Sequence, residues 1–512
     1  MPDNLPAGWT EVLASKLFSF ITSGSRGWAK HYAKEGAAFI RVQNIRRGRV
    51  DMDFADIQHV QPPPGSEGTR TKVQPGDILV TITADLGRIG LVADDVPEAY
   101  VNQHVALARP ANRDFAPYLA WFLTAPAAQA QLGLLDRGAT RSGLGLADIG
   151  AVRVSLPPLA EQRRIVARIE ALFGAIRDAR KDLDRTLVLA ERFRNALVAA
   201  AISGELASDR SGSGMSAEES GVFMDRLASE RRQLWEQSEL ARAAAKGRRL
   251  KDNWKDRFPS PVKPVEHYAD SLPAGWTLAS LDQLAWAASY GTSEKCDPAG
   301  SGSPVLRIPN VARGAIDLSD LKFATGDLGL VPGEAVAPGD LLVVRTNGSP
   351  DLVGRGAVVR QSLERDVYFA SYLIRFRLVG NDTLWRWIAL VWHSPMIRDQ
   401  VFAKAASSAG QYNVSMTELA SFALPIPPEA EQARLVNLVE ERLKVTDEME
   451  RQARASHDLL SRLERQILDV AFRGDLVPQD AADEPAEETL ARLRQEAEAP
   501  AGPRGRQRRR AA

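Results

Sequence analysis

Cysteine, histidine and an excess of charge of either sign are what the sequence lacks. With one cysteine, Cys296, the chain cannot hold a disulfide framework or a thiolate-rich metal site. The six histidines show no spacing typical of metal ligands. No apolar run approaches the roughly 20 residues that a membrane-spanning helix needs, and no secretory signal is visible at the start. These absences predict a cytoplasmic protein without a metal centre.

The charges of the chain cancel. It has 65 Lys and Arg residues and 65 Asp and Glu residues, so its formal net charge is zero. Proteins that bind nucleic acid usually carry a basic excess. If this protein binds DNA, its positive charge must be concentrated locally or supplied by a partner.

Motifs that would indicate an enzyme are missing as well. The sequence has no glycine-rich phosphate loop ending in Lys-Ser/Thr and no His-Glu-x-x-His. None of its Pro-Pro pairs follows Asp or Asn and precedes an aromatic residue, as amino-methyltransferase sites require. Acidic pairs such as Asp51 and Asp53 lie in polar, turn-like segments. The sequence therefore predicts no catalytic residue and no metal ligand.

What the sequence does contain is an internal repeat. Five short motifs occur twice, in the same order, 263 to 270 residues apart. The two copies of each motif are residues 5–10 and 272–277, 41–45 and 307–311, 75–80 and 338–343, 156–162 and 426–432, and 203–206 and 473–476. Because the order and the spacing are both kept, the chain is two diverged copies of one unit.

Each copy begins with a globular part of strands and turns. Gly76-Asp77 leads into a β-branched run at 78–83, which predicts a strand, and 101–108 and 368–378 favour further strands. Apolar residues at helical spacing predict short helices at 118–132 and 384–403. The predicted fold class is α+β.

Each copy ends in a long helix, predicted at 160–202 and 430–472. Pro157-Pro158 blocks a helix upstream of the first, and Gly204 marks its end. In the first helix apolar residues recur at spacings of three and four, as in a coiled coil, and the other copy's helix is the expected partner. The predicted seam is Ile165, Ile169, Leu172, Ile176, Ala179, Leu183, Leu187, Ala190, Phe193, Leu197 and Ala201, matched by Leu435, Val439, Arg442, Thr446, Met449, Ala453, His457, Leu460, Leu463, Ile467 and Ala471.

These elements divide the chain into six segments. The globular parts are 1–158 and 272–428, and the long helices are 159–206 and 429–476. Residues 207–271 form a linker, flexible by composition at 208–216, amphipathic and helical at 225–246, and stiffened by proline at 259–264. Residues 477–512 form a further helix and a basic tail.

Candidate DNA-binding residues lie in loops that occur in both copies. Arg pairs with guanine and Asn or Gln with adenine in the major groove, and glycine-rich basic loops allow close backbone approach. Surface turns with solvated arginines and ordinary hairpin tips explain the same loops without any function. The candidates are Arg41, Asn44, Arg46, Arg47, Lys72, Arg88, Thr140, Arg141, Arg307, Asn310, Arg313, Arg345, Asn347, Arg355, Gln411, Tyr412 and Asn413.

The duplicated motifs carry a resemblance to a known family. Two copies of Pro-Gly-Asp-(Ile/Leu)-Leu-Val, Pro-Pro-x-Ala-Glu-Gln-x-Arg-(Ile/Leu)-Val and Gly-(Glu/Asp)-Leu, in that order, resemble the specificity (S) subunit of type I restriction–modification enzymes, the HsdS family. The likeness runs from Leu5 to Gln495. The linker of about 60 residues and the basic tail depart from the family's pattern.

The resemblance implies a function without catalysis by this chain. Each globular part would be a target-recognition domain that reads one half of a bipartite, asymmetric double-stranded DNA site. The long helices would pair as an antiparallel coiled coil and dock two adenine-N6 methyltransferase (M) subunits, and motor-nuclease (R) subunits would join. S-adenosylmethionine, ATP and Mg²⁺ would then be bound by the partner subunits, with no cofactor in this chain.

Other functions remain open from the sequence. The chain fits a specificity subunit of a related methyltransferase–nuclease system. It also fits a structural adaptor whose domains bind protein or glycan on a coiled-coil spacer. An enzyme with an unrecognised active site is the third alternative.

Overall fold

The computed structural model describes residues 5–63, 65–135, 143–206, 217–266, 268, 272–312, 314–326, 328, 333–408 and 410–498. The chain divides into two compact units, Met1–Asp184 with Ala453–Ala512 (unit 1) and Arg185–Gln452 (unit 2). Each unit therefore holds one globular part and about half of each long helix. Within the described ranges, no helix is long and apolar enough to span a membrane.

Among its described residues, unit 1 contains three small sheets. A four-stranded antiparallel sheet has the order β2-β9-β6-β7, a second has the order β3-β5-β4-β8, and β1 pairs with β10. The strands are β1 (Thr10–Leu13), β2 (Phe18–Ser23), β3 (Tyr32–Ala33), β4 (Ala37–Ile40), β5 (Gln58–Val60), β6 (Ile78–Thr81), β7 (Ile89–Leu91), β8 (Ala99–Val101), β9 (Val105–Pro110) and β10 (Arg153–Leu156). The short helices are α1 (Ser66–Thr71), α2 (Ala116–Thr124), α3 (Pro126–Leu135) and α4 (Leu146–Gly150), with one-turn helices at η1 (Ala14–Lys16), η2 (Trp28–His31), η3 (Val42–Asn44) and η4 (Arg113–Phe115).

Unit 2 repeats this topology strand for strand. Its sheets are β12-β20-β16-β18, β13-β15-β14-β19 and β11-β23, with an additional sheet β17-β22-β21. The strands are β11 (Thr277–Ser280), β12 (Ala285–Tyr290), β13 (Cys296–Asp297), β14 (Pro304–Leu306), β15 (Lys322–Ala324), β16 (Asp340–Val344), β17 (Thr346–Asn347), β18 (Gly356–Val358), β19 (Tyr368–Phe369), β20 (Leu373–Leu378), β21 (Ala406–Ser408), β22 (Gln411–Asn413) and β23 (Ala423–Ile426). The helices are α6 (Ala217–Ala245), η5 (Trp254–Arg257), α7 (Ile308–Val311), α8 (Asp382–Trp392), α9 (Pro395–Lys404) and α10 (Met416–Ala420). The predicted α+β class and the duplication are confirmed.

The repeated Pro-Gly-Asp motif starts strand β6 in unit 1 and strand β16 in unit 2, each an inner strand of a four-stranded sheet. Gly76 turns the chain with φ +87°, and the buried Asp77 accepts a hydrogen bond from the Gln74 amide at 2.7 Å. The same carboxylate forms an ion pair with Arg109 of β9 at 2.7 Å. In unit 2, Asp340 pairs in the same way with Arg377 of β20 at 3.1 Å. The motif is thus explained by folding, because a buried carboxylate needs such partners.

Four expected elements are each interrupted. The helix expected at 118–132 is divided into α2 and α3, because the chain is extended at Ala125, before Pro126. The helix expected at 384–403 is divided into α8 and α9 at Ser394-Pro395, where Ser394 caps α9. The segments 101–108 and 368–378 each form two strands, β8 and β9, and β19 and β20, separated by a turn.

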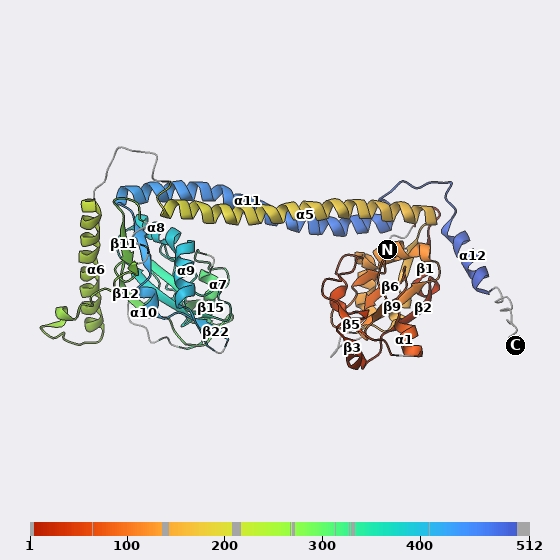
Figure 1. The fold of residues 1–512 in the computed structure, drawn as a ribbon, viewed down its shortest axis with the longest axis horizontal. Coiled ribbons are helices and arrows are strands. Elements are labelled where there is room, and N and C mark those ends of the chain that lie inside the picture. Colours follow the sequence, from red (N-terminus) through yellow and green to blue (C-terminus); the bar gives the residue numbers. More distant parts are fainter. Residues whose placement is uncertain are drawn as a thin grey trace, which may run out of the picture. The chain divides into compact units, whose positions relative to one another are not determined.

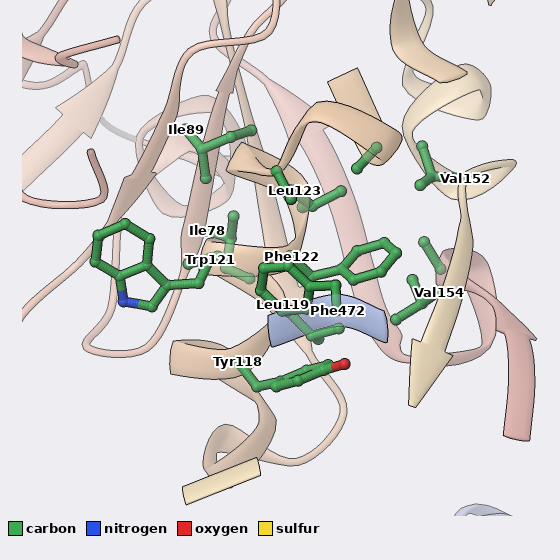
Figure 2. Packing of buried hydrophobic residues seen from close by; sticks show 14 of the residues in the cluster. Ile78, Ile89, Tyr118, Leu119, Trp121, Phe122, Leu123, Val152, Val154 and Phe472 are labelled. Carbon is green, nitrogen blue, oxygen red and sulfur yellow. The ribbon is translucent and has the colours of Figure 1, made fainter. Parts of the chain in front are cut away.

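The core of unit 1 is built mainly by α2 against the β6 sheet. Figure 2 shows Tyr118, Phe122 and Leu119 beside Phe472, which comes from the end of the long helix of the second repeat. The Tyr118 and Phe472 ring centroids are 5.4 Å apart and their planes are nearly perpendicular. One repeat's globular core is therefore completed by the other repeat's helix.

The two long helices are α5 (Leu159–Ile202) and α11 (Glu429–Arg473), close to the predicted bounds. They lie side by side (Figure 1) and run antiparallel: in unit 1 Arg180 pairs with Glu464 at 2.9 Å, and in unit 2 Arg194 bonds to Glu450 at 3.2 Å. Their shared apolar contacts in unit 2 include Leu197 and Val439. The predicted antiparallel pairing is confirmed.

The repeated motifs at the helix ends bind the globular parts. Trp9 donates its indole N–H to Glu161 of α5 at 3.0 Å, and Trp276 does the same to Glu431 of α11. A Cβ added at Gly204, where φ is +78°, would lie 2.4 Å from Cγ of Pro273. At the equivalent Gly474 it would lie 2.4 Å from Cγ of Pro6. The Leu-Pro-Ala-Gly-Trp motif is thus held by the start of its own helix and the end of the other.

Part of the predicted seam is wrong. Phe193, Met449 and Leu463 are 43–48% exposed, and Ala179 and Arg442 are exposed too. Phe173, which the seam omitted, is 2% exposed because it packs against Trp121 of the globular part, with ring centroids 4.7 Å apart. At this point α5 buries a second face against the globular part, and the spacing of the coiled-coil seam does not predict that contact.

Two further helices follow the long ones. The expected amphipathic helix of the linker is α6, whose Phe223 and Leu227 pack into the core of unit 2. Helix α12 (Ala486–Glu498) packs Ala486 and Leu490 into the core of unit 1. The segment 208–216, which the composition predicts to be flexible, and the basic residues of 504–510 lie outside the described residues.

Candidate nucleic-acid interface

The two candidate asparagines have the same internal role. Asn44 of η3 is 2% exposed; its side-chain oxygen accepts from the Arg41 amide at 2.9 Å, and its NH₂ donates to the Asp53 and Asp56 carbonyls. Asn310 of α7, 1% exposed, makes the same set of bonds with Arg307, Asp317 and Asp320. Both amides are saturated inside the protein, so these two residues shape the loops and present no group to a base.

The loop arginines next to them are only partly buried. Arg41 is half-buried, and its guanidinium has no hydrogen-bond or ion-pair partner in the described part of the chain. Arg307 is bound to Asp320 at 2.8 Å. Each arginine emerges from the end of a buried strand, β4 or β14, which fixes its backbone.

Three candidates of unit 1 form one cluster with acidic residues. Arg47 and Arg88 both bind Asp85, and Arg46 binds Asp53 at 2.7 Å. Hydrogen bonds from Arg47 and Arg88 lower the pKa of Asp85, and the bond from Arg46 lowers the pKa of Asp53. These carboxylates stay ionised and compete with phosphate for the arginines. The three arginines are thus largely compensated by the two carboxylates, which leaves little excess positive charge in the cluster.

Lys72 lies apart from that cluster. Its ammonium binds Glu98 at 2.6 Å, and its backbone bridges to Tyr100 of β8. Lys72 and Glu98 are both about half exposed, so this pair is open to solvent.

In unit 2 the structure brings five candidates together. Strand β17 pairs with β22, so Asn347 lies opposite Tyr412 and Thr346 opposite Asn413. The Val414 amide donates to the Arg345 carbonyl at 2.9 Å, which joins Arg345 to the same edge as Gln411. Arg355 is exposed and donates to the Asp351 carbonyl at 2.7 Å.

Unit 1 has the same loop pairing at the equivalent place. Thr83, which corresponds to Thr346, bridges to Gly143, which corresponds to Asn413. The loop that precedes Gly143 contains the candidates Thr140 and Arg141, which lie outside the described residues, as does Arg313. Both repeats therefore place the segment after the central strand beside the segment before the last short helix.

Several residues of this region were missed by the sequence analysis. Tyr290, 45% exposed, lies under the Arg345 guanidinium with 4.8 Å to the ring centroid, and Tyr372 is 52% exposed. A Cβ added at Gly24 or at its counterpart Gly291 would lie 2.2 Å from a backbone carbonyl oxygen. The recurrence of Gly-Ser and Gly-Thr at these positions was the available signal. Ala84 holds a φ of +68°, a strained value next to the bridged Thr83.

The comparisons with known proteins agree with this arrangement. Residues 66–183 match a family model described as the type I restriction modification DNA specificity domain. The EcoKI specificity subunit of Escherichia coli K12 is 24% identical over 94% of this chain and 92% of its own length. The StySPI specificity subunit of Salmonella potsdam is 23% identical over the same shares. Over nearly its whole length the chain is therefore similar to type I specificity subunits, as the duplicated motifs predicted.

A solved structure supports the fold of this chain. A chain from a study of complex assembly and conformational transition in a type I restriction–modification system is 20% identical, with a TM-score of 0.60. The match covers 93% of this chain and all of that one. The relatives are named as specificity subunits of type I restriction enzymes, and in the described residues no group of His, Cys, Asp or Glu is arranged to hold a metal ion.

Proposed function

We propose that each globular part of this specificity subunit reads one half of a bipartite, asymmetric DNA site, while α5 and α11 dock two methyltransferase subunits. The observation that carries the proposal is the loop pairing that both repeats share, Thr83 with Gly143 and Thr346 with Asn413. The backbone arrangement is common to both, whereas the side chains around it differ. Two globular parts that share a backbone fold but carry different loop side chains suit two half-sites of different sequence.

The side chains at these edges suit base recognition. In unit 2, Gln411 and Asn413 carry the amides that pair with adenine, and Arg345 carries the guanidinium that pairs with guanine. Stacking on Tyr290 holds Arg345 in place, which lowers the entropy that it loses on binding. In unit 1, Arg41 supplies donors, and Arg46, Arg47 and Arg88 can exchange their carboxylate partners for acceptors on the DNA.

The neutral charge of the chain favours a shared interface. Phosphate contacts position a protein on DNA without reading its sequence. In the proposed complex the methyltransferase subunits, together with motor-nuclease subunits, supply most of those contacts and bind S-adenosylmethionine, ATP and Mg²⁺. This chain then supplies the base contacts.

Exposed apolar residues on the long helices support docking at two equivalent places. Leu189 and Phe193 of α5 are 62% and 48% exposed in unit 2. Leu459 and Leu463 of α11, at the same positions of the second repeat, are 61% and 43% exposed in unit 1. Leu463 also lines an apolar groove of about 1160 Å³ with Leu134 and Leu476. Such apolar patches mark interaction surfaces, and their duplication suits two copies of one partner.

Methylation mapping tests the proposal directly. Host DNA from cells with the methyltransferase gene, with and without this gene, is compared for modified adenines. We expect a two-part motif that disappears without this chain, and co-purification with two methyltransferase copies. Unchanged methylation together with a free monomer would rule the proposal out. Salt-sensitive retention on DNA would count against an adaptor role, since phosphate contacts weaken as salt rises.

A further inference from the structure

Unit 2 has a cavity with charged lining residues that the pairing of β17 with β22 does not explain. It has a volume of about 420 Å³ and lies between α6 and the edge strand β12, with Arg375 and Arg377 of β20 in its wall. Arg242 and Glu334 also line it. The cavity has the size of a small-molecule site, and three of its four charged lining side chains are arginines.

Comparison with unit 1 shows that the cavity's charge is particular to unit 2. Ser289 lies opposite Arg375 in the strand register, as Thr22 lies opposite Leu107 in unit 1. Arg375 thus replaces a leucine that is fully buried. Asp340 pairs with Arg377, as Asp77 pairs with Arg109, so unit 2 has two arginines where unit 1 has one for the same carboxylate.

Arg375 is held at the cavity with only weak charge compensation. Its side chain is 8% exposed and lies 3.7 Å from Asp340, and its Nη1 donates to the Glu334 carbonyl at 2.7 Å. Burial lowers the pKa of Arg375 to about 10, a sign that its charge lacks solvation. Arg242, at the rim, is bound to Glu239.

A hydroxyl at the cavity is also left without a bond. The Ser289 Oγ is buried and has no hydrogen-bond partner among the described residues, although Ser289 lines the cavity. The equivalent Thr22 hydroxyl of unit 1 accepts from Arg70, which also donates to the Ser23 carbonyl at 2.7 Å. Buried polar groups usually have partners, so the Ser289 hydroxyl is available to bond a group that enters the cavity.

We propose that this cavity binds a phosphate group through Arg375, with Arg377, Arg242 and the Ser289 hydroxyl as further donors. Phosphate offers acceptor oxygens to all of these donors and a negative charge for Arg375. The group comes either from the DNA backbone, since the lining residue Tyr290 also contacts Arg345, or from a free phosphate or nucleotide. This site does not depend on which bases are read.

The test compares the full-length chain with Arg375→Leu, which installs the residue of unit 1. Arg257→Leu is the matched control, since Arg257 is exposed and does not line the cavity. Calorimetry with inorganic phosphate, and then with AMP, measures the free ligand. We expect Arg375→Leu to lower the affinity by about tenfold or more, because a charged donor is lost, and Arg257→Leu to leave it unchanged.

A second arm measures DNA affinity against salt concentration. If the ligand is a backbone phosphate, free phosphate shows no binding and the salt slope of Arg375→Leu falls by about one. If neither phosphate binding nor the slope depends on Arg375, the proposal is wrong. Ser289→Leu, which fills the cavity and keeps the arginine, repeats both measurements should Arg375→Leu fail to fold, and unchanged results there would equally overturn it.

Discussion

Glu161 shows how one buried side chain joins a globular part to its helix. It is 1% exposed and accepts the indole N–H of Trp9. Burial raises the pKa of Glu161 above its usual value, against the effect of the Trp9 bond. The Glu161 carboxylate therefore stabilises the fold through its hydrogen bond, while burial of its negative charge is unfavourable. Substitutions can separate these two effects.

Glu161→Ala should destabilise the protein by about 1–3 kcal/mol, because the Trp9 N–H loses its acceptor. Glu161→Gln keeps an acceptor and removes the charge, so it should be much milder at neutral pH. Since the folded pKa is the higher one, protonation favours the folded state. Wild type should therefore gain stability relative to Glu161→Gln as pH falls from neutral through the raised pKa toward about 4.5. Parallel pH curves in denaturant unfolding would contradict this.

Substitutions of Asn44 and Arg41 test two different properties of the loop, its stability and its contact with DNA. Asn44→Ala removes three internal hydrogen bonds from a buried site and should lower the free energy of unfolding by about 1–3 kcal/mol. Arg41→Ala should leave stability nearly unchanged and weaken binding of the target by about 1–3 kcal/mol if Arg41 contacts a base. Denaturation and DNA titration of both variants check this. Equal loss of stability in both would make Arg41 a structural residue.

At the scale of elements, some apolar residues of α5 pack in the core and others are exposed, where we propose that they dock the partner. Phe173 is buried against Trp121, so Phe173→Ala should cost about 3–5 kcal/mol in thermal or chemical unfolding. Phe193 is 48% exposed on the same helix, so Phe193→Ala is the matched control with a small effect on stability. Phe193→Asp should instead reduce co-purification of the methyltransferase. A methyltransferase complex unaffected by Phe193→Asp and Leu463→Asp together would place docking elsewhere.

Long elements were predictable from the sequence, and their surroundings were not. The limits of α5 follow from Pro157-Pro158, Gly204 and its apolar period, and those of α11 follow from the repeat of the same motifs. Phe173 was missed because its partner, Trp121, lies on an element of the globular part that the period does not report. The breaks before Pro126 and Pro395 show how one proline ends a short apolar helix.

The DNA-binding site itself stays a prediction; the sequence located the paired loops but not the roles of their two asparagines. The repeat drew attention to Asn44 and Asn310 because both recur, but they recur for folding: each saturates its amide inside the loop. Tyr290 went unnoticed because its counterpart in unit 1 is Ser23. Residues that read different half-sites are expected to differ between the two repeats. Residues that are the same in both repeats are therefore mostly those needed for folding.

At the scale of the whole molecule, the duplication supplies two globular parts of one fold, which we propose act as two readers. Because both readers act on one duplex, their half-sites should lie about one helical turn apart, roughly 10–10.5 base pairs, or a multiple of it, with no sequence preference between them. Thr140, Arg141 and Ser142 in the first repeat and Gln411, Tyr412 and Asn413 in the second differ in chemistry. The two half-sites should therefore differ in sequence.

Exchange of one reader tests this independence. Replacing residues 1–155 by the corresponding segment of a relative keeps α5 and the Trp9–Glu161 contact, because the relative supplies the equivalent tryptophan where the motif is retained. Methylation mapping should then show one half of the motif changed and the other half kept. The reciprocal exchange of 272–425 should change the opposite half. A continuous motif, or an exchange that alters both halves together, would mean that the two readers do not act separately.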